Sequence, residues 1–431
     1  MAPKIRVAIS GGGVAGASLL YGLLQHPNID AHIFESAAQF REAGVAFGIN
    51  RSAAKALELM SGLPCLERAG GVPMVGVRFH LAEGVGAGEV VREWDTKRDG
   101  KAWDGKALLT IVQRANLLHE FLAGVPAERM HASKKLVRAE RRGEGGIVLH
   151  FADGTTHECD ILIGADGIHS TVRKIVVGDD DPAAHPRNTG WWAIMTLQPY
   201  EKARSSIGNG PVDIDDAREM SWIGDGVFLL HNILSNGTIV QFSVCSKDEN
   251  ADGKPAWGKK VSAEEIRRTF VSAKRPAHMN TAVEELLCDQ PEQPIIYLYD
   301  HLHASTYASG GIAVMGDAAH ATTPWQGSGG GICIEDSMIL SSLLGQAKSP
   351  AEARVALKVY DQVRRPRTQR LVDSSYTTGQ ILMGQYEESG LDAEKLRKAL
   401  APRWDFIFDF DNARHREEAL ELMRKEVAAS G

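Results

Sequence analysis

The feature that most constrains the fold is a glycine-rich turn near the start of the chain. Residues 8–18 read AISGGGVAGAS, in which Gly11, Gly13 and Gly16 fit the pattern GxGxxG. A strand-like apolar run precedes the turn, and a helix-like run follows it. In this setting the first glycine permits a tight turn, the second lets a pyrophosphate approach the backbone, and the third lets the helix pack on the strand.

An acidic residue stands where this pattern requires one. Glu35 lies 19 residues after Gly16, at the end of the second predicted strand, where a carboxylate accepts hydrogen bonds from an adenosine ribose. Free N–H groups at the start of the helix, around Val14, favour phosphate. The unit therefore predicts a Rossmann-like βαβ site for a dinucleotide. A glycine-rich turn without a ligand is the alternative, and the motif alone leaves FAD and NAD(P) both open.

The composition argues against several other classes of protein. The formal net charge is −7, whereas nucleic acids and anionic membranes require a basic face. The five cysteines are scattered without a CxxC pair, which is typical of reduced thiols rather than of disulfides or a zinc site. No signal-peptide core is evident, and no apolar run reaches the ~18 residues of a membrane span. We therefore expect a cytoplasmic protein that is a monomer or a homodimer.

Two further motifs lie downstream. Residues 160–173 read DILIGADGIHSTVR, a buried strand followed by a turn and a helix start that contain Asp166 and Arg173. The alternative for this segment is a turn in which Asp166 caps the helix and Arg173 points outward. Residues 311–336 read GIAVMGDAAHATTPWQGSGGGICIED, so that Asp317 ends a strand and a cluster of glycines follows it. Glycine is costly in regular structure, which indicates close approach to another group here.

The three motifs together resemble those of FAD-dependent aromatic monooxygenases, the group A flavoprotein hydroxylases, and most resemble the fungal-type salicylate hydroxylase-like branch. In that family the DG motif, matched by Asp166, lies near the FAD pyrophosphate and is implicated in NAD(P)H binding. Asp317 matches the aspartate that binds the ribityl chain. Arg114 matches an RxxL arginine near the cofactor, and Ala46 lies where the chain passes the flavin. Gly330 lies in the glycine-rich loop expected beside the isoalloxazine ring.

The resemblance implies an α/β protein: a Rossmann-like FAD-binding domain with an inserted, mainly antiparallel β-sheet substrate domain and a helical C-terminal tail. Short alternating segments between about residues 185 and 245 independently predict an antiparallel sheet. Three prolines, Pro350, Pro366 and Pro402, are expected to break the helices of the tail. We expect a discontinuous FAD-binding domain at 1–70, 100–180 and 290–345, a β-rich substrate domain at 71–99 and 181–289, and a helical region at 346–431.

The implied reaction is a monooxygenation. In the family, NAD(P)H reduces FAD, O2 adds to give a flavin C4a-hydroperoxide, and one oxygen atom is transferred to a small electron-rich aromatic substrate. The alternatives are an epoxidase or dearomatising oxygenase of a secondary-metabolite intermediate and, more remotely, a non-catalytic flavin-binding redox sensor. No metal is implied; His301 and His303 form an HLH pair, for which a strand end or loop is the favoured interpretation.

Candidate substrate-site residues come from the β-rich segments and the flavin loop. Trp192, His231 and Trp325 are the candidate catalytic residues, and an aromatic-lined pocket suits a flat apolar ligand. For His231, on an apolar strand, a structural core position is the alternative. Three positions depart from relatives: Trp325 replaces a histidine, Trp192 an arginine, and Asn232 a tyrosine. These departures remove groups that hold a phenolate in the relatives, which makes an indole or a neutral phenol plausible and weakens a salicylate assignment.

Overall fold

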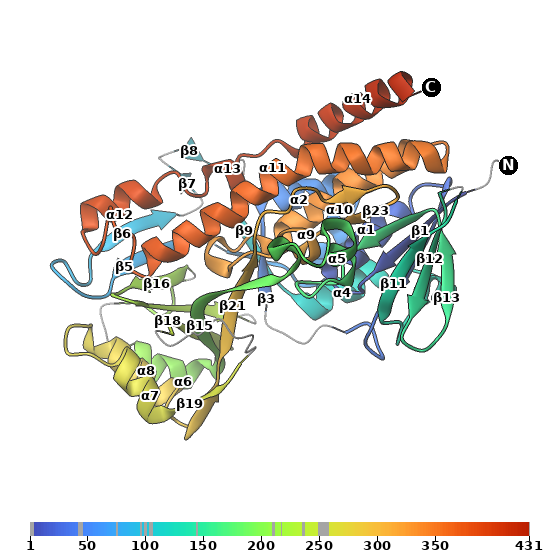
Figure 1. The fold of residues 1–431 in the computed structure, drawn as a ribbon. Helices are drawn as coiled ribbons and strands as arrows, with labels where there is room; N and C mark the ends of the chain where they lie inside the picture. Colours follow the sequence, from blue (N-terminus) through green and yellow to red (C-terminus); the bar gives the residue numbers. More distant parts are fainter. Residues whose placement is uncertain are drawn as a thin grey trace.

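The computed structural model describes residues 4–41, 46–74, 76–94, 97–98, 101–102, 107–143, 145–208, 212–216, 218–234, 238–248 and 258–430. Two large sheets lie side by side in this part of the chain, and the long helix α11 (Pro350–Leu382) runs past both of them (Figure 1). The cofactor and substrate candidates are distributed over these two sheets and the segments that join them.

The first sheet is the dinucleotide-binding type that the glycine turn predicts. Its strands in spatial order are β10 (Met130–His131), β2 (Ile29–Phe34), β1 (Ile5–Ser10), β14 (Ile161–Gly164), β23 (Ile312–Val314) and β22 (Ala308–Ser309). All neighbours are parallel except β22 and β23. Residues that are remote in sequence, at the ends of β1, β14 and β23, are thereby brought to one edge of the sheet.

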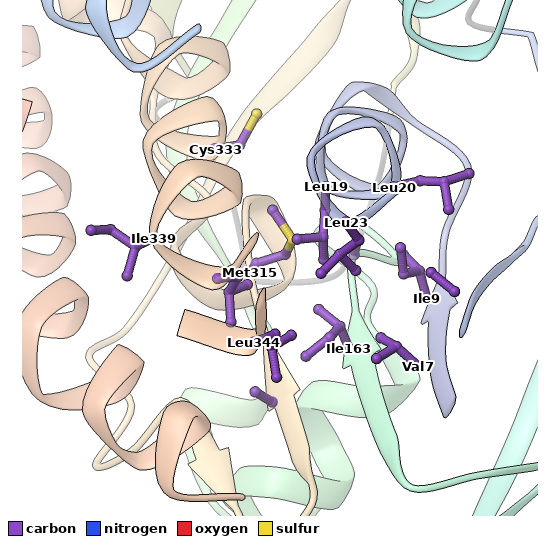
Figure 2. Packing of buried hydrophobic residues seen from close by; sticks show 14 of the residues in the cluster. Val7, Ile9, Leu19, Leu20, Leu23, Ile163, Met315, Cys333, Ile339 and Leu344 are labelled. Atoms are coloured by element: carbon purple, nitrogen blue, oxygen red, sulfur yellow. The ribbon is translucent and has the colours of Figure 1, made fainter. Parts of the chain in front are cut away.

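The core of this layer lies between the sheet and two helices, α1 (Val14–Leu23) and α10 (Gly329–Gln346). Figure 2 shows Leu19 and Leu23 of α1 beside Met315, with Leu344 of α10 close to them. These side chains are fully buried. Burial of each large aliphatic side chain contributes roughly 1.5–3 kcal/mol to stability, so this packing holds the glycine turn rigidly at the edge of the sheet.

The second sheet is mainly antiparallel, as the alternating sequence predicts. Its strands in spatial order are β21 (Ile296–His301), β15 (Pro186–Pro199), β18 (Ile239–Lys247), β17 (Val227–Leu234), β16 (Glu219–Ile223), β5 (Val77–Leu81) and β6 (Val90–Trp94). Only the β16–β5 pair is parallel. One face packs on three helices, α6 (Tyr200–Ile207), α7 (Ala263–Phe270) and α8 (Ala277–Leu286). The opposite face therefore turns toward the first sheet and the C-terminal helices.

Smaller elements complete the described chain. The short helices are α2 (Arg51–Leu59), α3 (Leu63–Arg68), α4 (Arg114–Leu122), α5 (Thr171–Val177) and α9 (Asp317–His320). One small sheet contains β3 (Ala46–Asn50), β9 (Leu109–Gln113) and β4 (Val72–Met74), and another contains β11 (Leu136–Arg141), β12 (Ile147–Phe151) and β13 (Thr156–Cys159). Two strand pairs remain, β7 (Lys97–Arg98) with β8 (Lys101–Ala102) and β19 (Lys260–Ser262) with β20 (Glu292–Pro294).

The C-terminal region is helical, and one expectation about it is wrong. α11 continues through Pro366 for 33 residues, whereas Pro366 was expected to break it. An internal proline costs a helix about 3 kcal/mol. On either side of Pro366, Arg364 and Arg367 form buried ion pairs with Glu335 of α10, which anchor both parts of α11 to the neighbouring helix. Pro350, by contrast, occupies the first turn of α11, where proline is tolerated. The helices that follow are α12 (Ala393–Leu400), α13 (Asp405–Phe408) and α14 (Asn412–Ser430).

Candidate active site

The N-terminal glycine turn is shaped by backbone packing. Gly11 has φ of +112°, and a Cβ added there would lie 2.1 Å from the carbonyl oxygen of Ala165 at the end of β14. A Cβ on Gly16 would lie 2.0 Å from the carbonyl oxygen of Gly11. Both glycines thus bring the turn, the helix and β14 close together. Gly13 and Val14, at the start of α1, line the cavity described below.

Glu35 fixes this turn from the side. Its carboxylate accepts hydrogen bonds from the backbone N–H of Gly12 and of Ala37, both at 2.7 Å, and from the hydroxyl of Ser36 at 3.0 Å. A carboxylate offers about four lone-pair positions. The observed bonds therefore leave acceptor capacity for a ribose hydroxyl.

The DG motif lies in the turn between β14 and α5, where its aspartate binds the start of the helix. Asp166 caps the start of α5, accepting hydrogen bonds from the Ser170 hydroxyl and from the N–H of Thr171 at 2.8 Å and of Val172 at 3.2 Å. Burial raises the pKa of this carboxyl, and the hydrogen bonds oppose that effect. The capping alternative for Asp166 is therefore confirmed. The cap directs the chain after Gly167, whose backbone lines the cavity.

Arg173 is fully buried, so the outward orientation weighed for it is wrong. Its guanidinium donates to backbone carbonyls of Ala183 at 2.5 Å, Leu302 at 2.9 Å and Ala319 at 2.5 Å. Burial lowers its pKa to about 10. Because Ala319 belongs to α9, the second motif is tied directly to the helix that starts at Asp317.

A buried ion network fixes the loop around Asp317, which itself lines the cavity. Asp336 accepts hydrogen bonds from the Gly316 N–H at 3.0 Å and from Arg364 Nε at 2.8 Å, and it lies 2.6 Å from His320 Nε2. Although burial opposes the effect, His320 and Arg364 lower the pKa of Asp336. The network joins α9, α10 and α11 behind the loop.

The glycine-rich loop after Trp325 leads into α10. The backbone of residues 326–330 lines the cavity. A Cβ on Gly330 would lie 2.2 Å from the ring of Phe47, so only glycine allows this close approach. The start of an 18-residue helix presents unpaired N–H groups and a partial positive charge, which favours an anionic group.

These segments meet at one cavity of about 520 Å³. Its lining includes six of the ten predicted cofactor residues, namely Gly13, Val14, Ala46, Arg114, Asp317 and Gly330. Added Cβ atoms on Gly167 and Gly327 would meet no atom within 4 Å, so backbone is open to the cavity at both positions. These open positions, together with the helix starts and Asp317, fit a flavin nucleotide.

The second sheet forms the other wall of the cavity. Phe228 of β17 and Ala193 of β15 line it, as does Trp325 from the loop. The Trp325 indole packs edge-on against Trp191, with ring centroids 5.4 Å apart, and against Phe228, with centroids 5.5 Å apart. Trp325 is thus placed at the junction between the glycine loop and the sheet.

His231 and Trp192 lie on the opposite face of that sheet, so the expectation that they contact substrate is corrected. Side chains alternate along a strand, and the neighbours of His231 on β17, Leu230 and Asn232, line the cavity. Trp192 packs edge-on against Phe270 of α7, with centroids 5.6 Å apart. Burial, aided by His278 and His80, lowers the pKa of His231 to about 3, which keeps it neutral.

The lining contains polar residues that the motifs did not reveal. Glu219 of β16, Gln241 and Ser243 of β18 and Asn232 of β17 face the cavity. The segment REMSWIG contained the signal for Glu219, because strand alternation places it opposite to the core residue Met220. The HLH histidines are separate: His301 is buried, whereas His303 lies 2.9 Å from Asp373.

The comparisons with known proteins agree with this arrangement. A family model described as an FAD binding domain matches residues 4–375. The chain is 34% identical to 6-methylsalicylate 1-monooxygenase of Aspergillus terreus, over 97% of this chain and 92% of that protein. It is 32% identical to an FAD-dependent monooxygenase of Monascus ruber, over 95% and 94% of the two chains.

The chain belongs to the family of FAD-dependent aromatic monooxygenases. A solved structure of a salicylate hydroxylase substrate complex has the same mixed α/β fold, with a TM-score of 0.81 and 22% identity over 96% of this chain and 98% of that one. The resemblance to this family and its FAD cofactor is thus confirmed. A non-catalytic redox sensor is not favoured, because the relatives over nearly the whole chain are named monooxygenases. No helix in the described part of the chain combines the length and apolar character of a membrane span.

Proposed function

We propose that this monooxygenase hydroxylates a small aromatic compound held between the FAD-binding layer and the cavity face of the antiparallel sheet. The single observation that carries the proposal is the continuity of the cavity. Its lining runs from Gly13 at the first glycine turn, past Asp317, to Phe228 on the second sheet. A cofactor at one end and a flat apolar ligand at the other would therefore meet inside one enclosure.

The proposed cofactor site divides into two groups of residues. Gly13, Val14, Ala46, Arg114, Asp317 and Gly330 contact FAD, whereas Gly11, Gly16, Glu35 and Asp166 shape the turns that receive it. In this assignment the N–H groups of α1 bind the pyrophosphate, Asp317 accepts a hydrogen bond from the ribityl chain, and the start of α10 faces the isoalloxazine ring. Arg173 acts at a distance, because its bonds to the carbonyls of α9 position Asp317.

When bound at this site, FAD would supply the redox chemistry, with NADH or NADPH as the electron donor and O2 as the source of the transferred oxygen atom. The protein contributes orientation and the exclusion of water. Trp325, Phe228 and Leu230 present apolar surface toward the substrate, which excludes water and limits side reactions. We place the substrate between these side chains, with β5 and β15–β18 forming a substrate domain inserted into the FAD-binding domain and α11–α14 forming a helical tail.

The name of the Aspergillus relative points to a hydroxybenzoate-type substrate for that protein. For this chain we propose a phenolic or related aromatic substrate. The test is a purified holoprotein with a flavin spectrum, assayed for oxidation of NADH and NADPH with and without phenols, benzoates and indoles. Stimulated oxidation with a hydroxylated product supports the proposal. Failure to retain FAD, even when FAD is supplied, would overturn it.

A further inference from the structure

The sheet wall of the cavity carries a polar cluster in otherwise apolar surroundings. Met220 pairs with His231 across β16 and β17, so the preceding residue, Glu219, lies beside Asn232. Asn232 pairs in turn with Gln241 of β18. Glu219, Asn232 and Gln241 thus form a polar row across three strands, and all of them line the cavity.

Two buried polar atoms, one in this row and one beside it, have no hydrogen-bond partner among the residues that the structure describes. They are the Asn232 side-chain oxygen and the Ser243 hydroxyl, both buried and both without a hydrogen bond to any described residue. Their residues are only 6% and 7% exposed. An unpaired buried polar group costs about 1–3 kcal/mol, so both atoms are poised to bind a ligand that can pair with them.

The charges around the cavity set the class of ligand. Among the described lining residues, the charged ones are Arg114, Asp317 and Glu219. Arg114 begins α4 directly after Gln113, which pairs with Ala46, so it belongs to the cofactor end. The sheet wall presents an acid and no cation among its described residues. A substrate carboxylate would meet repulsion there, whereas a hydroxyl group would meet acceptors.

We propose that Glu219 accepts a hydrogen bond from the hydroxyl group of a neutral phenol and takes its proton, while the Ser243 hydroxyl and the amide N–H of Asn232 donate to the phenol oxygen. The O–H bond of the phenol breaks, its proton bonds to a carboxylate oxygen of Glu219, and the electron pair remains on the phenolate oxygen. The neutral carboxyl then donates a hydrogen bond back to that oxygen. The phenolate ring is more electron-rich and so reacts more readily with an electrophilic oxygen. This inference rests on the proposed hydroxylase function.

The surroundings of Glu219 suit this role. Burial raises its pKa to about 7, and the hydrogen bond from the Ser221 hydroxyl, at 3.3 Å, opposes the shift. A phenol has a pKa near ~10. Because the pKa of Glu219 is raised to about 7, the difference in pKa between the proton donor and the proton acceptor is only roughly 3.

The other titratable groups near Glu219 are already paired or lie elsewhere. Arg78 of β5 forms ion pairs with Asp216 at 3.2 Å and with Glu93 at 3.0 Å. Arg218 forms ion pairs with the same two carboxylates, at 2.7 Å and 3.4 Å. His231 faces the other side of the sheet, and Arg114 and Asp317 stand at the cofactor end of the cavity. The pH dependence of the site is therefore assigned to Glu219.

The first test measures ligand binding to the wild-type holoprotein by the change in its flavin spectrum. The three probes are 4-methylphenol, 4-methylanisole and 4-methylbenzoate, which have similar size and differ in the group that would meet the polar row. We expect the phenol to bind about tenfold or more tightly than the ether and the carboxylate. Equal or tighter binding of 4-methylbenzoate would overturn the inference without any variant being needed.

The second test compares Glu219→Gln with the wild type, using a phenol that the wild type hydroxylates. Because the base must be ionised, kcat/KM of the wild type should rise with pH through about 7. Glu219→Gln should lose that rise and fall about 100-fold or more at neutral pH, while retaining FAD. Glu394→Gln, on α12 with a side chain 76% exposed, is the matched control and should match the wild type.

The outcomes separate the inference from the function on which it rests. Hydroxylation of a phenol by Glu219→Gln with unchanged kcat/KM and an unchanged pH profile would overturn the role of Glu219 and leave the hydroxylase function intact. A wild-type protein that holds FAD but oxidises no aromatic compound would overturn the hydroxylase function itself. Recovery of the pH-dependent limb in Glu219→Asp would support a carboxylate base.

Discussion

Replacing Gly11 with alanine tests whether the first glycine of the turn is required by the packing of the protein itself. An alanine Cβ would lie 2.1 Å from the Ala165 carbonyl oxygen and 2.8 Å from the Asp166 backbone nitrogen. Both atoms belong to the backbone, so no side chain can rotate away. The residue also has φ of +112°, which L-amino acids rarely adopt.

The expected cost follows from these two effects. Left-handed backbone costs a non-glycine residue roughly 1–2 kcal/mol. Forcing an extra methyl group into a packed site costs roughly 1–3 kcal/mol. Alanine also lowers the conformational entropy of the unfolded chain, which stabilises the folded protein by about 0.4–1 kcal/mol. We therefore expect Gly11→Ala to lower the free energy of unfolding by about 1–4.5 kcal/mol and to weaken FAD binding, because the turn and Asp166 must move apart.

Two control variants separate the effects. Gly178 has φ of +100° and no atom within 4 Å of an added Cβ, so Gly178→Ala should show the backbone cost alone, about 1 kcal/mol. Gly124 lies outside the left-handed region and is also open, so Gly124→Ala should be neutral or slightly stabilising. Urea unfolding of the FAD-free proteins and titration with FAD provide the measurements. Equal stability of Gly11→Ala and Gly178→Ala would refute the reasoning.

Three further variants test other parts of the account. His231→Leu should leave kcat/KM and its pH profile within about threefold of the wild type, because His231 faces away from the cavity. It should also reduce acid sensitivity: His231 is neutral in the folded protein down to its pKa of about 3, so its contribution to stability is present above the ordinary value of ~6.5 and is lost as pH falls toward 3. Urea unfolding at pH 7 and 5 measures this, and an acid sensitivity equal to that of the wild type would contradict it. Arg364→Met should cost about 3–5 kcal/mol of unfolding free energy, because it leaves buried carboxylates such as Asp336 without their cation; a loss below 1 kcal/mol would show that the network is not stabilising. Gly379→Ala would place a Cβ 2.3 Å from Trp325 Nε1, so it should weaken aromatic ligand binding several-fold while FAD binding persists, whereas a simple gain in helix stability with unchanged ligand binding would contradict this account.

Much of the cofactor side could be predicted because its residues are constrained by backbone geometry. The glycine turn, the acid at the end of β2 and the strand before Asp317 each leave a local pattern in the sequence. The structure brings six of the predicted cofactor residues to one cavity. That they contact FAD stays a prediction, which the Gly11 series and FAD titration address.

The sheet wall was harder to predict because a single residue decides which face a side chain occupies. Trp191 and Trp192 are adjacent, and the pairing of β15 with β21 shifts register between Asn188 and Trp192. The sequence therefore did not reveal that Trp191 reaches Trp325 while Trp192 packs on α7. His231 was selected because histidine is a common catalytic residue, but it lies on the face of the sheet that points away from the cavity. The alternation of side chains along β16, by contrast, places Glu219 on the cavity face.

The burial of Arg173 and the continuation of α11 through Pro366 could not be predicted from local patterns. Arg173 and Pro366 both depend on partners remote in sequence. Arg173 is buried because carbonyls of α9 and of the chain near Leu302 converge on it. Pro366 remains in a helix whose residues on either side, Arg364 and Arg367, form ion pairs with Glu335 of α10. Local preferences for helix, strand or turn do not depend on such tertiary contacts and so cannot predict them.

The central claim is that this protein transfers one oxygen atom from O2 to an aromatic substrate within the cavity. The most direct measurement is turnover under ¹⁸O2 with purified holoprotein, NADH or NADPH and a phenol that stimulates oxidation, followed by mass spectrometry of the product. The account predicts one ¹⁸O atom in each hydroxylated product molecule, and none when the label is in water. A product labelled from water, or ligand-stimulated oxidation of the nicotinamide that yields only hydrogen peroxide for every ligand tested, would contradict it.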